Sequence, residues 1–506
     1  MTRVRFHWGV VIVAALSVVA CSGGGPTPPT SPLDPVSPSP APTRSGTAQP
    51  TASPTPTPTS GTPGPTVSPS PTPTRSGTAQ PTASPTPTPT SGPANEPFSV
   101  SLAAGQPDVN GNVLEGTELQ NMVAFGGKLF AAIGIWEDTS PPASGPQIIA
   151  LNSPTGKWQQ DTSFPGHVRI DSLEPITFTT NASGVALPSS VTMLAASVDG
   201  ALFTRGTNGT WTDVHLPGTL TVRAIGTHQD AFTHVDELFI GSGVPDGVTP
   251  GAIYTAVYDP TQPGSLRVAP TAEFTGYVNR VMAFVEVDGR LLFVAKPGLY
   301  ERTDGFSPSW SEVANIPPVP DSVNNSGLRG LTVVGSNPPV VLAGLEGDAG
   351  LIYSFNPTTF AYTDFSIGTL LQQQWGLGLS QYIISAYNNM PQVTDSLVGG
   401  PVNLIGLQAH NPNLASSAWY LVRTVSGQYT LHQVTDLTAL SPLGLVAVRT
   451  ICLSPFAADQ GQALYLGGYD ANFMPAHNTA WLYRVGLQTA LSSASIPASR
   501  SRRNLR

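Results

Sequence analysis

The sequence predicts an all-β fold made of repeated four-stranded units. Charged residues form only 10% of the 506-residue chain, against about 25% in an ordinary soluble domain. Only three residues are lysine, so the chain has too few charges to cover the outer faces of many helices. From Phe98 onward, short apolar runs alternate with clusters of turn-forming residues, which is typical of short strands.

A strand-like segment with a small residue at its fourth position recurs along this region. It occurs seven times, at intervals that average about 56 residues. The copies are Leu129–Ala132, Met193–Ala196, Leu238–Gly241, Leu292–Ala295, Val341–Gly344, Asn403–Gly406 and Leu464–Gly467. A second apolar segment follows several copies, and an outer strand follows a turn that often ends in an aromatic residue (Trp158, Trp211 and Trp310).

Four strands repeated seven times predict a β-propeller, because a single four-stranded sheet cannot bury both of its faces without stacked neighbours. The small residues would let neighbouring blades pack closely. We therefore expect a propeller of seven four-stranded blades over residues 98–490. A propeller of six or eight blades and a β-helix are the alternatives.

Two further motifs indicate a relationship to known propellers. The pairs Gly126-Gly127 and Gly467-Gly468 are similar to the kelch glycine pair, and the segments 207–211 and 303–310 resemble degenerate Asp-boxes. The domain thus resembles the kelch and sialidase-like propellers. Propellers host both binding proteins and enzymes, so this resemblance does not select a function.

The first residues predict an extracytoplasmic location. Arg3 and Arg5 precede the apolar run from Trp8 to Ala20, which fits the apolar region of a secretory signal peptide. The segment Val18-Val19-Ala20-Cys21 resembles the lipobox of bacterial lipoproteins. This resemblance implies that residues 1–20 are removed and that Cys21 is the lipid attachment site, which would anchor the protein to the cell membrane. An ordinary signal peptide is the alternative.

Residues 21–97 form a predicted disordered stalk. Between Pro26 and Pro97, 23 of 72 residues are proline, and most of the others are Thr, Ser, Ala or Gly. Such a segment has too few large apolar side chains to offset the entropy of ordering. A 20-residue sequence occurs twice, at 42–61 and 73–92. Residues 491–506 form a basic tail that we also expect to be disordered.

The charge of the predicted domain argues against one class of partner. Between Phe98 and Gly486 there are 14 Lys or Arg and 29 Asp or Glu residues, a formal net charge of −15. A field of this sign repels polyanions, so we expect no nucleic-acid partner.

The motif search gives no catalytic residue, cofactor or metal site. The zinc-protease, nucleophile-elbow and P-loop motifs are absent from the sequence. His228 and His234 lie close to Asp230, Asp236 and Glu237, a group that could bind a metal or transfer protons. We favour the simpler interpretation, a polar loop between two strands.

Arginines recur before core strands of different repeats and are the best candidates for ligand binding. They are Arg169, Arg223, Arg280, Arg329 and Arg449. If this element is the innermost strand of each blade, the guanidinium groups approach a common axis and could bind a carboxylate or phosphate. Alternatively, each arginine bonds to neighbouring carbonyl groups or to an acid of the next blade.

We therefore expect a lipid-anchored extracytoplasmic propeller that binds a glycan, a cell-wall component or a protein, and we lean against an enzyme. A glycan-directed hydrolase or lyase on the same scaffold is one alternative. A structural or adhesion surface protein is another.

Overall fold

The computed structural model describes the domain that follows the stalk. It covers residues 93–492 except 137, 219–220, 244–249, 277–279, 296–297, 317–326, 336–337, 347–349, 371–380, 385–389, 397–398, 411–417, 435–446 and 470–476. Contacts divide the chain into two compact units, Met1–Ala83 and Ser84–Arg506. Every described residue belongs to the second unit. Cys21, the duplicated segments and residues 493–506 of the tail lie outside the described residues.

Five antiparallel sheets each contain four strands paired in the order of the sequence. Sheet I has β4 (Glu118–Phe125), β5 (Lys128–Gly134), β6 (Gln147–Leu151) and β7 (Gln159–Ser163), and sheet II has β8 (Ile170–Thr180), β9 (Ala186–Val198), β10 (Ala201–Arg205) and β11 (Trp211–Val214). Sheet III has β12 (Val222–Gln229), β13 (Asp236–Ser242), β14 (Gly251–Tyr258) and β15 (Leu266–Val268), with β16 (Phe274–Gly276) also paired to β14. Sheet IV has β17 (Val281–Val287), β18 (Arg290–Ala295), β19 (Gly298–Thr303) and β20 (Ser309–Asn315), and sheet V has β21 (Gly327–Val334), β22 (Val340–Glu346), β23 (Leu351–Phe355) and β24 (Tyr362–Ser366).

The remaining large sheet, sheet VI, has nine strands in the order β1-β32-β31-β30-β27-β28-β29, with β25 and β26 also paired to β27. Its members are β1 (Ser99–Ala103), β25 (Gln381–Ile384), β26 (Gln392–Asp395), β27 (Gly400–His410), β28 (Trp419–Thr424), β29 (Tyr429–Gln433), β30 (Ala447–Leu453), β31 (Ala463–Tyr469) and β32 (Ala480–Gly486). The pairing of β1 with β32 joins the two ends of the domain.

The prediction of seven four-stranded blades is wrong in number, because the described residues form five four-stranded blades beside sheet VI. The last two copies of the repeat, in β27 and β31, belong to the same hydrogen-bonded sheet. A single residue pair, Gln408 with Ala447, joins β27 to β30 and makes this sheet continuous. The spacing of the repeats could not reveal this long-range pairing.

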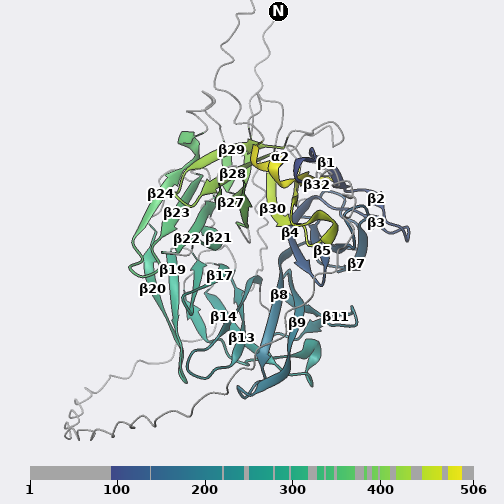
Figure 1. The fold of residues 1–506 in the computed structure, drawn as a ribbon. Helices are drawn as coiled ribbons and strands as arrows, with labels where there is room; N and C mark the ends of the chain where they lie inside the picture. The colour runs from purple at the N-terminus through teal and green to yellow at the C-terminus, as the bar shows by residue number, and fades with distance from the viewer. Residues whose placement is uncertain are drawn as a thin grey trace, which may run out of the picture. The chain divides into compact units, whose positions relative to one another are not determined.

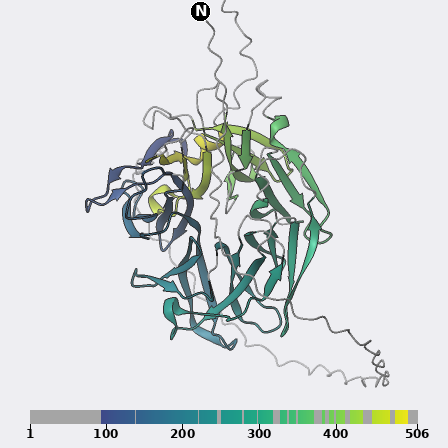
Figure 2. The ribbon, with the colours of Figure 1, turned by 180° about the vertical axis from the view of Figure 1, so that it is seen from behind.

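The all-β propeller class is confirmed. The first strands of successive sheets contact one another, from β4 through β8, β12 and β17 to β21, and β4 also contacts β30 of sheet VI. Figures 1 and 2 show these sheets arranged around a common centre, with their first strands innermost. Apolar side chains fill the spaces between neighbouring sheets.

The small residues of the repeat allow this close packing, as the sequence predicted. A Cβ atom on Gly241 of β13 would lie 2.4 Å from Cγ1 of Val281 in the next sheet. A Cβ atom on Gly467 of β31 would lie 2.4 Å from Cδ2 of Leu119 in sheet I. Side chains at these positions would therefore force neighbouring sheets apart.

Short elements complete the domain. They are η1 (Pro93–Asn95), the hairpin β2 (Gln106–Pro107) and β3 (Val113–Leu114), η2 (Pro263–Ser265), η3 (Ala457–Asp459) and α2 (Leu487–Ser492). Helix α2 ends two residues beyond the predicted domain boundary at 490, because Ala490 and Leu491 are buried in the core. Among the described residues, no helix combines the length and the apolar character needed to cross a membrane.

Candidate functional site

The predicted arginines lie together at the inner edge of the sheets. Arg169, Arg223, Arg280 and Arg329 line one small cavity of about 10 Å³, beside Gln120, Asp171 and Met282. Arg449 lies 3.5 Å from Glu118, and Glu118 lies 3.8 Å from Arg169. We call these five residues the arginine cluster.

A bulge in the innermost strands brings side chains to this place. In β12 the partner register skips Arg223, because Val222 pairs with Ser242 and Ala224 pairs with Gly241. The register skips one residue in the same way in four other innermost strands, at Gln120, Asp171, Met282 and Arg449. A β-bulge leaves one residue unpaired and redirects its side chain. The repeated bulge therefore builds the lining of the central site.

The five arginines occupy three positions in the repeat, whereas the sequence analysis treated them as one set. Arg223 and Arg449 are bulge residues, and Arg169 and Arg280 immediately precede β8 and β17. Arg329 lies within β21 and pairs with Gly344. Arg169 is two residues before Asp171, and residues two apart on extended chain face the same side. Accordingly, Nε of Arg169 lies 3.1 Å from a carboxylate oxygen of Asp171.

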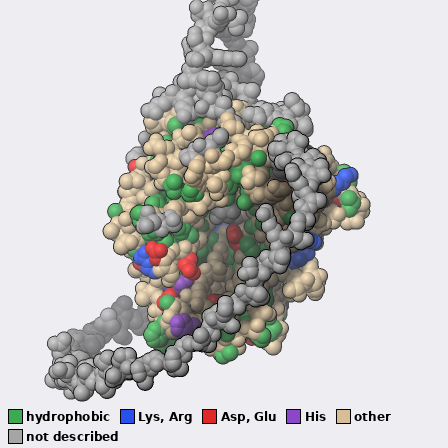
Figure 3. Space-filling view, in the orientation of Figure 1, with side chains coloured by type: hydrophobic (Ala, Val, Ile, Leu, Met, Phe, Trp, Pro, Cys, Tyr) green, Lys and Arg blue, Asp and Glu red, His purple; other side chains and the backbone are tan. Residues whose placement is uncertain are grey.

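Two acidic side chains form ion pairs with arginines of the cluster. Asp171 pairs with Arg169 and Arg223, and Glu118 pairs with Arg169 and Arg449. All five arginine side chains are largely buried, so water screens their charges poorly. The cluster gathers five arginines in a domain whose net charge is acidic, and Figure 3 shows a few acidic side chains on one face of that domain and in its hollow.

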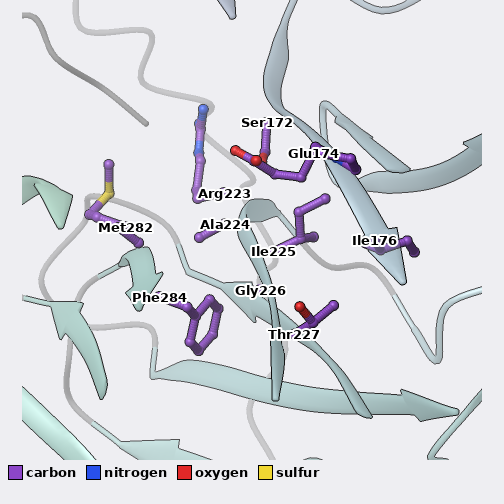
Figure 4. A pocket seen from close by; sticks show the side chains of 12 residues that line it. Ser172, Glu174, Ile176, Arg223, Ala224, Ile225, Gly226, Thr227, Met282 and Phe284 are labelled. Atoms are coloured by element: carbon purple, nitrogen blue, oxygen red, sulfur yellow. The ribbon is translucent and has the colours of Figure 1, made fainter. Parts of the chain in front are cut away.

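A larger cavity of about 170 Å³ adjoins the arginine cluster and shares Arg223 and Met282 with it. Ser172, Glu174 and Ile176 of β8 form one wall, the backbone of β12 from Arg223 to Thr227 forms the floor, and Phe284 of β17 forms the opposite wall. Figure 4 shows Glu174 reaching from β8 toward Arg223, with Thr227 and Phe284 at the other end. We call this space the channel cavity.

Glu174 has an altered acidity. Desolvation raises the pKa of this carboxyl group to about 8, so it is mostly protonated at neutral pH. A protonated carboxyl group can donate a hydrogen bond into the channel cavity. The sequence analysis missed Glu174, because nothing in the local sequence shows that this position of β8 faces the channel.

A second arginine centre, also missed by the sequence analysis, lies between sheets III and IV. The Arg302 side chain is 1% exposed and contacts four carboxylates within 3.0 Å. They belong to Asp230, Glu237, Glu273 and Asp304. We call this group the Arg302 network. Local sequence offers no signal for it, since three of the acids are 29 to 72 residues from Arg302.

Two carboxyl groups of the network have opposite shifts in acidity. Burial raises the pKa of Glu237 to about 7, against the attraction of Arg302. Burial also opposes ionisation of Asp230, but hydrogen bonds from the backbone N–H groups of Thr233 and Phe232 and from Arg302 outweigh it and lower the pKa to about 2. The network thus holds one firmly ionised acid and one acid that titrates near neutrality.

The predicted aromatic residues before the outer strands join neighbouring sheets. Each donates its indole N–H to the preceding sheet: Trp158 to Ser101 of β1 at 3.0 Å, Trp211 to Asp161 of β7 at 2.7 Å, and Trp310 to Glu273 at 2.8 Å. Trp211 and Trp310 also end the two degenerate Asp-box segments. In this protein those segments connect sheets.

The structure separates the two histidines of the predicted polar cluster. The His228 side chain is 1% exposed and lies between Glu286 and Asp304, at 2.8 and 3.0 Å. His234 is exposed in the following turn, where its φ is 58°. Within the described part of the chain, no three His, Cys, Asp or Glu side chains are placed to hold a metal ion together.

Neither a protein-family model nor a curated protein matches the chain. Among solved structures, the chain is similar to BBS1N in complex with ARL6DN (TM-score 0.43, 11% identity, 79% of this chain and 98% of that chain). It is also similar to AFV00434, an ancestral GH74 enzyme (TM-score 0.44, 12% identity, 76% and 47%), and to a chain of the Mitotic Checkpoint Complex (TM-score 0.38, 14% identity, 81% and 97%). The site described above rests on this chain's own residues.

Proposed function

We propose that this protein is a binding protein whose arginine cluster holds an anionic group of its ligand. The observation that carries the proposal is the meeting of four recurring arginines, from four successive sheets, around one small cavity. Arg449 extends the group through Glu118. A guanidinium group binds carboxylate or phosphate through two parallel hydrogen bonds.

The burial of these arginines supports a role in binding. Water screens buried guanidinium groups poorly, so they attract an anionic group more strongly than exposed ones do. A ligand that binds only the folded protein would also stabilise the fold. The ligand would be a glycan, a cell-wall component or a protein that presents an anionic group.

We further propose that lipid on Cys21 anchors the protein on the extracytoplasmic side of the membrane. The support is the segment Val18-Val19-Ala20-Cys21 after a short apolar run. Several acyl chains on one residue anchor a protein stably, whereas one chain does not. Mass spectrometry of the mature N-terminus tests this. Diacylglycerol on an N-terminal Cys21 is the expected result, and an unmodified Cys21 would contradict it.

Charge reversal tests the binding proposal. We expect Arg223→Glu and Arg329→Glu in the full-length chain each to weaken binding of inorganic phosphate or acetate at least tenfold, measured by calorimetry at low salt. Arg290→Glu is the matched control, because Arg290 pairs with Glu301 at 3.1 Å and lines neither cavity. Unchanged affinity in both cluster variants would refute the proposal.

A glycan-directed hydrolase or lyase is the second candidate, and Glu174 is the observation that favours it. A carboxyl group with a pKa of about 8 keeps the proton that a general acid needs. Incubation with acidic oligosaccharides, followed by an assay for new reducing ends, tests this candidate. Turnover that Glu174→Gln abolishes would support it, and the absence of product would leave the binding role as the better account.

A further inference from the structure

We propose that two exposed phenylalanines, Phe232 and Phe306, form a docking surface for a basic peptide segment that carries an apolar anchor. We call these two residues the aromatic pair. The inference goes beyond the proposed anion-binding function, because it concerns another place in the fold and a partner of the opposite charge. It combines the exposure of the two rings, the hydrogen bonds that hold them and the charge of the loops around them.

The aromatic pair exposes a contiguous apolar surface. Phe306 is 84% exposed and Phe232 is 59% exposed. Their ring centroids lie 4.8 Å apart at an interplanar angle of 80°, so the edge of one ring meets the face of the other. A single exposed apolar side chain is ordinary, but two aromatic rings in contact at the surface form the kind of patch that anchors a partner.

The two rings come from neighbouring sheets and from loops of the same type of position. Phe232 lies in the connection 230–235 between β12 and β13, and Phe306 lies in the connection 304–308 between β19 and β20. In a four-stranded antiparallel sheet, the connection from the first strand to the second and that from the third to the fourth lie at the same end. The aromatic pair therefore lies at one end of sheets III and IV, where their loops meet.

Hydrogen bonds between the two loops hold the aromatic pair in place. The carboxylate of Asp304 accepts a hydrogen bond from the backbone N–H of Ala231 at 2.8 Å, and that of Asp230 accepts one from the backbone N–H of Gly305 at 3.2 Å. Both acids also bind the buried Arg302, at 2.6 and 2.8 Å. Because each loop is bonded to the other and to the Arg302 network, a partner would bind a surface that is already ordered, and less entropy is lost on binding.

The loops around the aromatic pair are acidic. The connections at this end of sheets II, III and IV contain four aspartates and one histidine, but no lysine or arginine. They are 181–185, 206–210, 230–235, 259–265, 288–289 and 304–308, and the structure describes all of them. Asp288 is exposed, and the nearby Glu286 side chain is 48% exposed. Arg290, at the start of β18, already pairs with Glu301 at 3.1 Å.

This charge selects the chemistry of the partner. An apolar side chain can pack on the aromatic pair, and Lys or Arg side chains on either side of it can meet the carboxylates of Asp288 and Glu286. The same carboxylates disfavour a surface of anionic lipid, which attracts basic segments. A peptide segment that alternates basic and apolar residues therefore matches both features of the surface.

Calorimetry with three blocked peptides and the full-length chain tests the inference. The first peptide is acetyl-Arg-Phe-Arg-Phe-Arg-amide; the second has serine in place of phenylalanine, and the third has glutamate in place of arginine. We expect the first to bind at low salt with a Kd on the order of 0.1 mM, and the other two to bind at least tenfold more weakly. Equal binding of the serine peptide would overturn the role of the aromatic pair.

Variants of the aromatic pair locate the binding. Phe306→Ser and Phe232→Ser should each weaken binding of the first peptide at least tenfold. Val109→Ser is the matched control, because Val109 is 57% exposed but lies in the hairpin between β2 and β3. Thermal melting identifies a variant that is merely unfolded. Unchanged affinity in a folded Phe306→Ser protein would contradict the docking surface.

Asp288→Asn tests the contribution of charge. Asp288 has a φ of 51°, a conformation that asparagine also tolerates, so the turn is kept. We expect affinity for the first peptide to fall about threefold and to depend less on salt. Asp213→Asn removes a carboxylate that is 49% exposed on β11, outside these loops, and should change neither. Equal losses in the two variants would show that only the overall charge of the domain attracts the peptide, and would overturn the assignment of the partner.

Two other occupants of the surface give different results. Binding to phosphatidylcholine vesicles that Phe306→Ser abolishes, without peptide binding, would replace the peptide by a lipid surface. A dimer in analytical ultracentrifugation that Phe306→Ser dissociates, without peptide binding, would replace it by a second copy of the chain. Either result would overturn the proposed partner.

Discussion

Buried arginines lie at two places in this protein, and their surroundings differ. In the Arg302 network one guanidinium group contacts four carboxylates, and all lie between two sheets. In the arginine cluster five arginines lie at the inner edge of the sheets, and four of them line one cavity. The first arginine is enclosed by acids of two sheets, whereas the arginines of the cluster border a space.

The partners of Arg302 give it a structural role. Every nitrogen of the Arg302 guanidinium group donates a hydrogen bond to an acidic side chain. These acids lie on sheets III and IV or in the segments next to their strands. The ion pairs of Arg302 therefore hold the two sheets together. Trp310 donates to one of the same acids. In the arginine cluster, bulges redirect the side chains of Arg223 and Arg449.

The largest expected effect is the loss of stability in Arg302→Met. This change leaves four carboxylates close together without their cation, and breaking a buried ion pair in this way costs about 3–5 kcal/mol. Arg223→Met should lie within about 1 kcal/mol of the wild type, because Asp171 keeps its ion pair with Arg169 at 3.1 Å and is not left as an unpaired buried charge. Urea unfolding of the three proteins measures the difference. Equal losses in the two variants would show that the two arginine groups do not differ as argued.

A smaller effect is expected in the pH dependence of stability. The folded-state pKa of Glu237, about 7, lies above its ordinary value of 4.5, so the folded protein binds more protons than the unfolded chain between these values. Glu237 therefore makes the protein less stable as pH rises from about 5 to 7, by at most about 1.4 kcal/mol per pH unit.

Glu237→Gln should remove this contribution. We expect the variant to match the wild type near pH 5 and to become progressively more stable than it toward pH 7, as measured by unfolding at a series of pH values. Asp213→Asn is the control, because the Asp213 side chain is 49% exposed and lies outside the network. A constant difference between Glu237→Gln and the wild type at every pH would contradict the shifted acidity.

Much of the fold could be predicted from local patterns. Short apolar runs, turns and a small residue at the fourth repeat position led to an all-β propeller, and Gly241 and Gly467 confirm the reason given for the small residues. The number of blades could not be predicted, because the pair Gln408 and Ala447 joins strands that belong to different repeats. Strand spacing along the chain contains no information about such a pairing.

The candidate site, like the fold, could be predicted from the sequence only in part. The recurrence of arginine before core strands was visible in the sequence, and the structure brings those residues to one place. Their different positions in the repeat were not visible, since they depend on where each strand begins and on its bulge. Glu174 was also hidden, because its acidity depends on burial by residues that are distant in sequence.

The sequence by itself determined the all-β class, the acidic charge of the domain and the recurrence of its arginines, because composition and periodicity are properties of the chain alone. Only the tertiary structure decided which arginines have an excess of acidic partners and which face a cavity. Arg302 finds Asp230 across 72 residues of chain, and a one-residue bulge turns Arg223 toward the channel. Both depend on strand register and sheet packing, which fix the distances between residues far apart in the sequence.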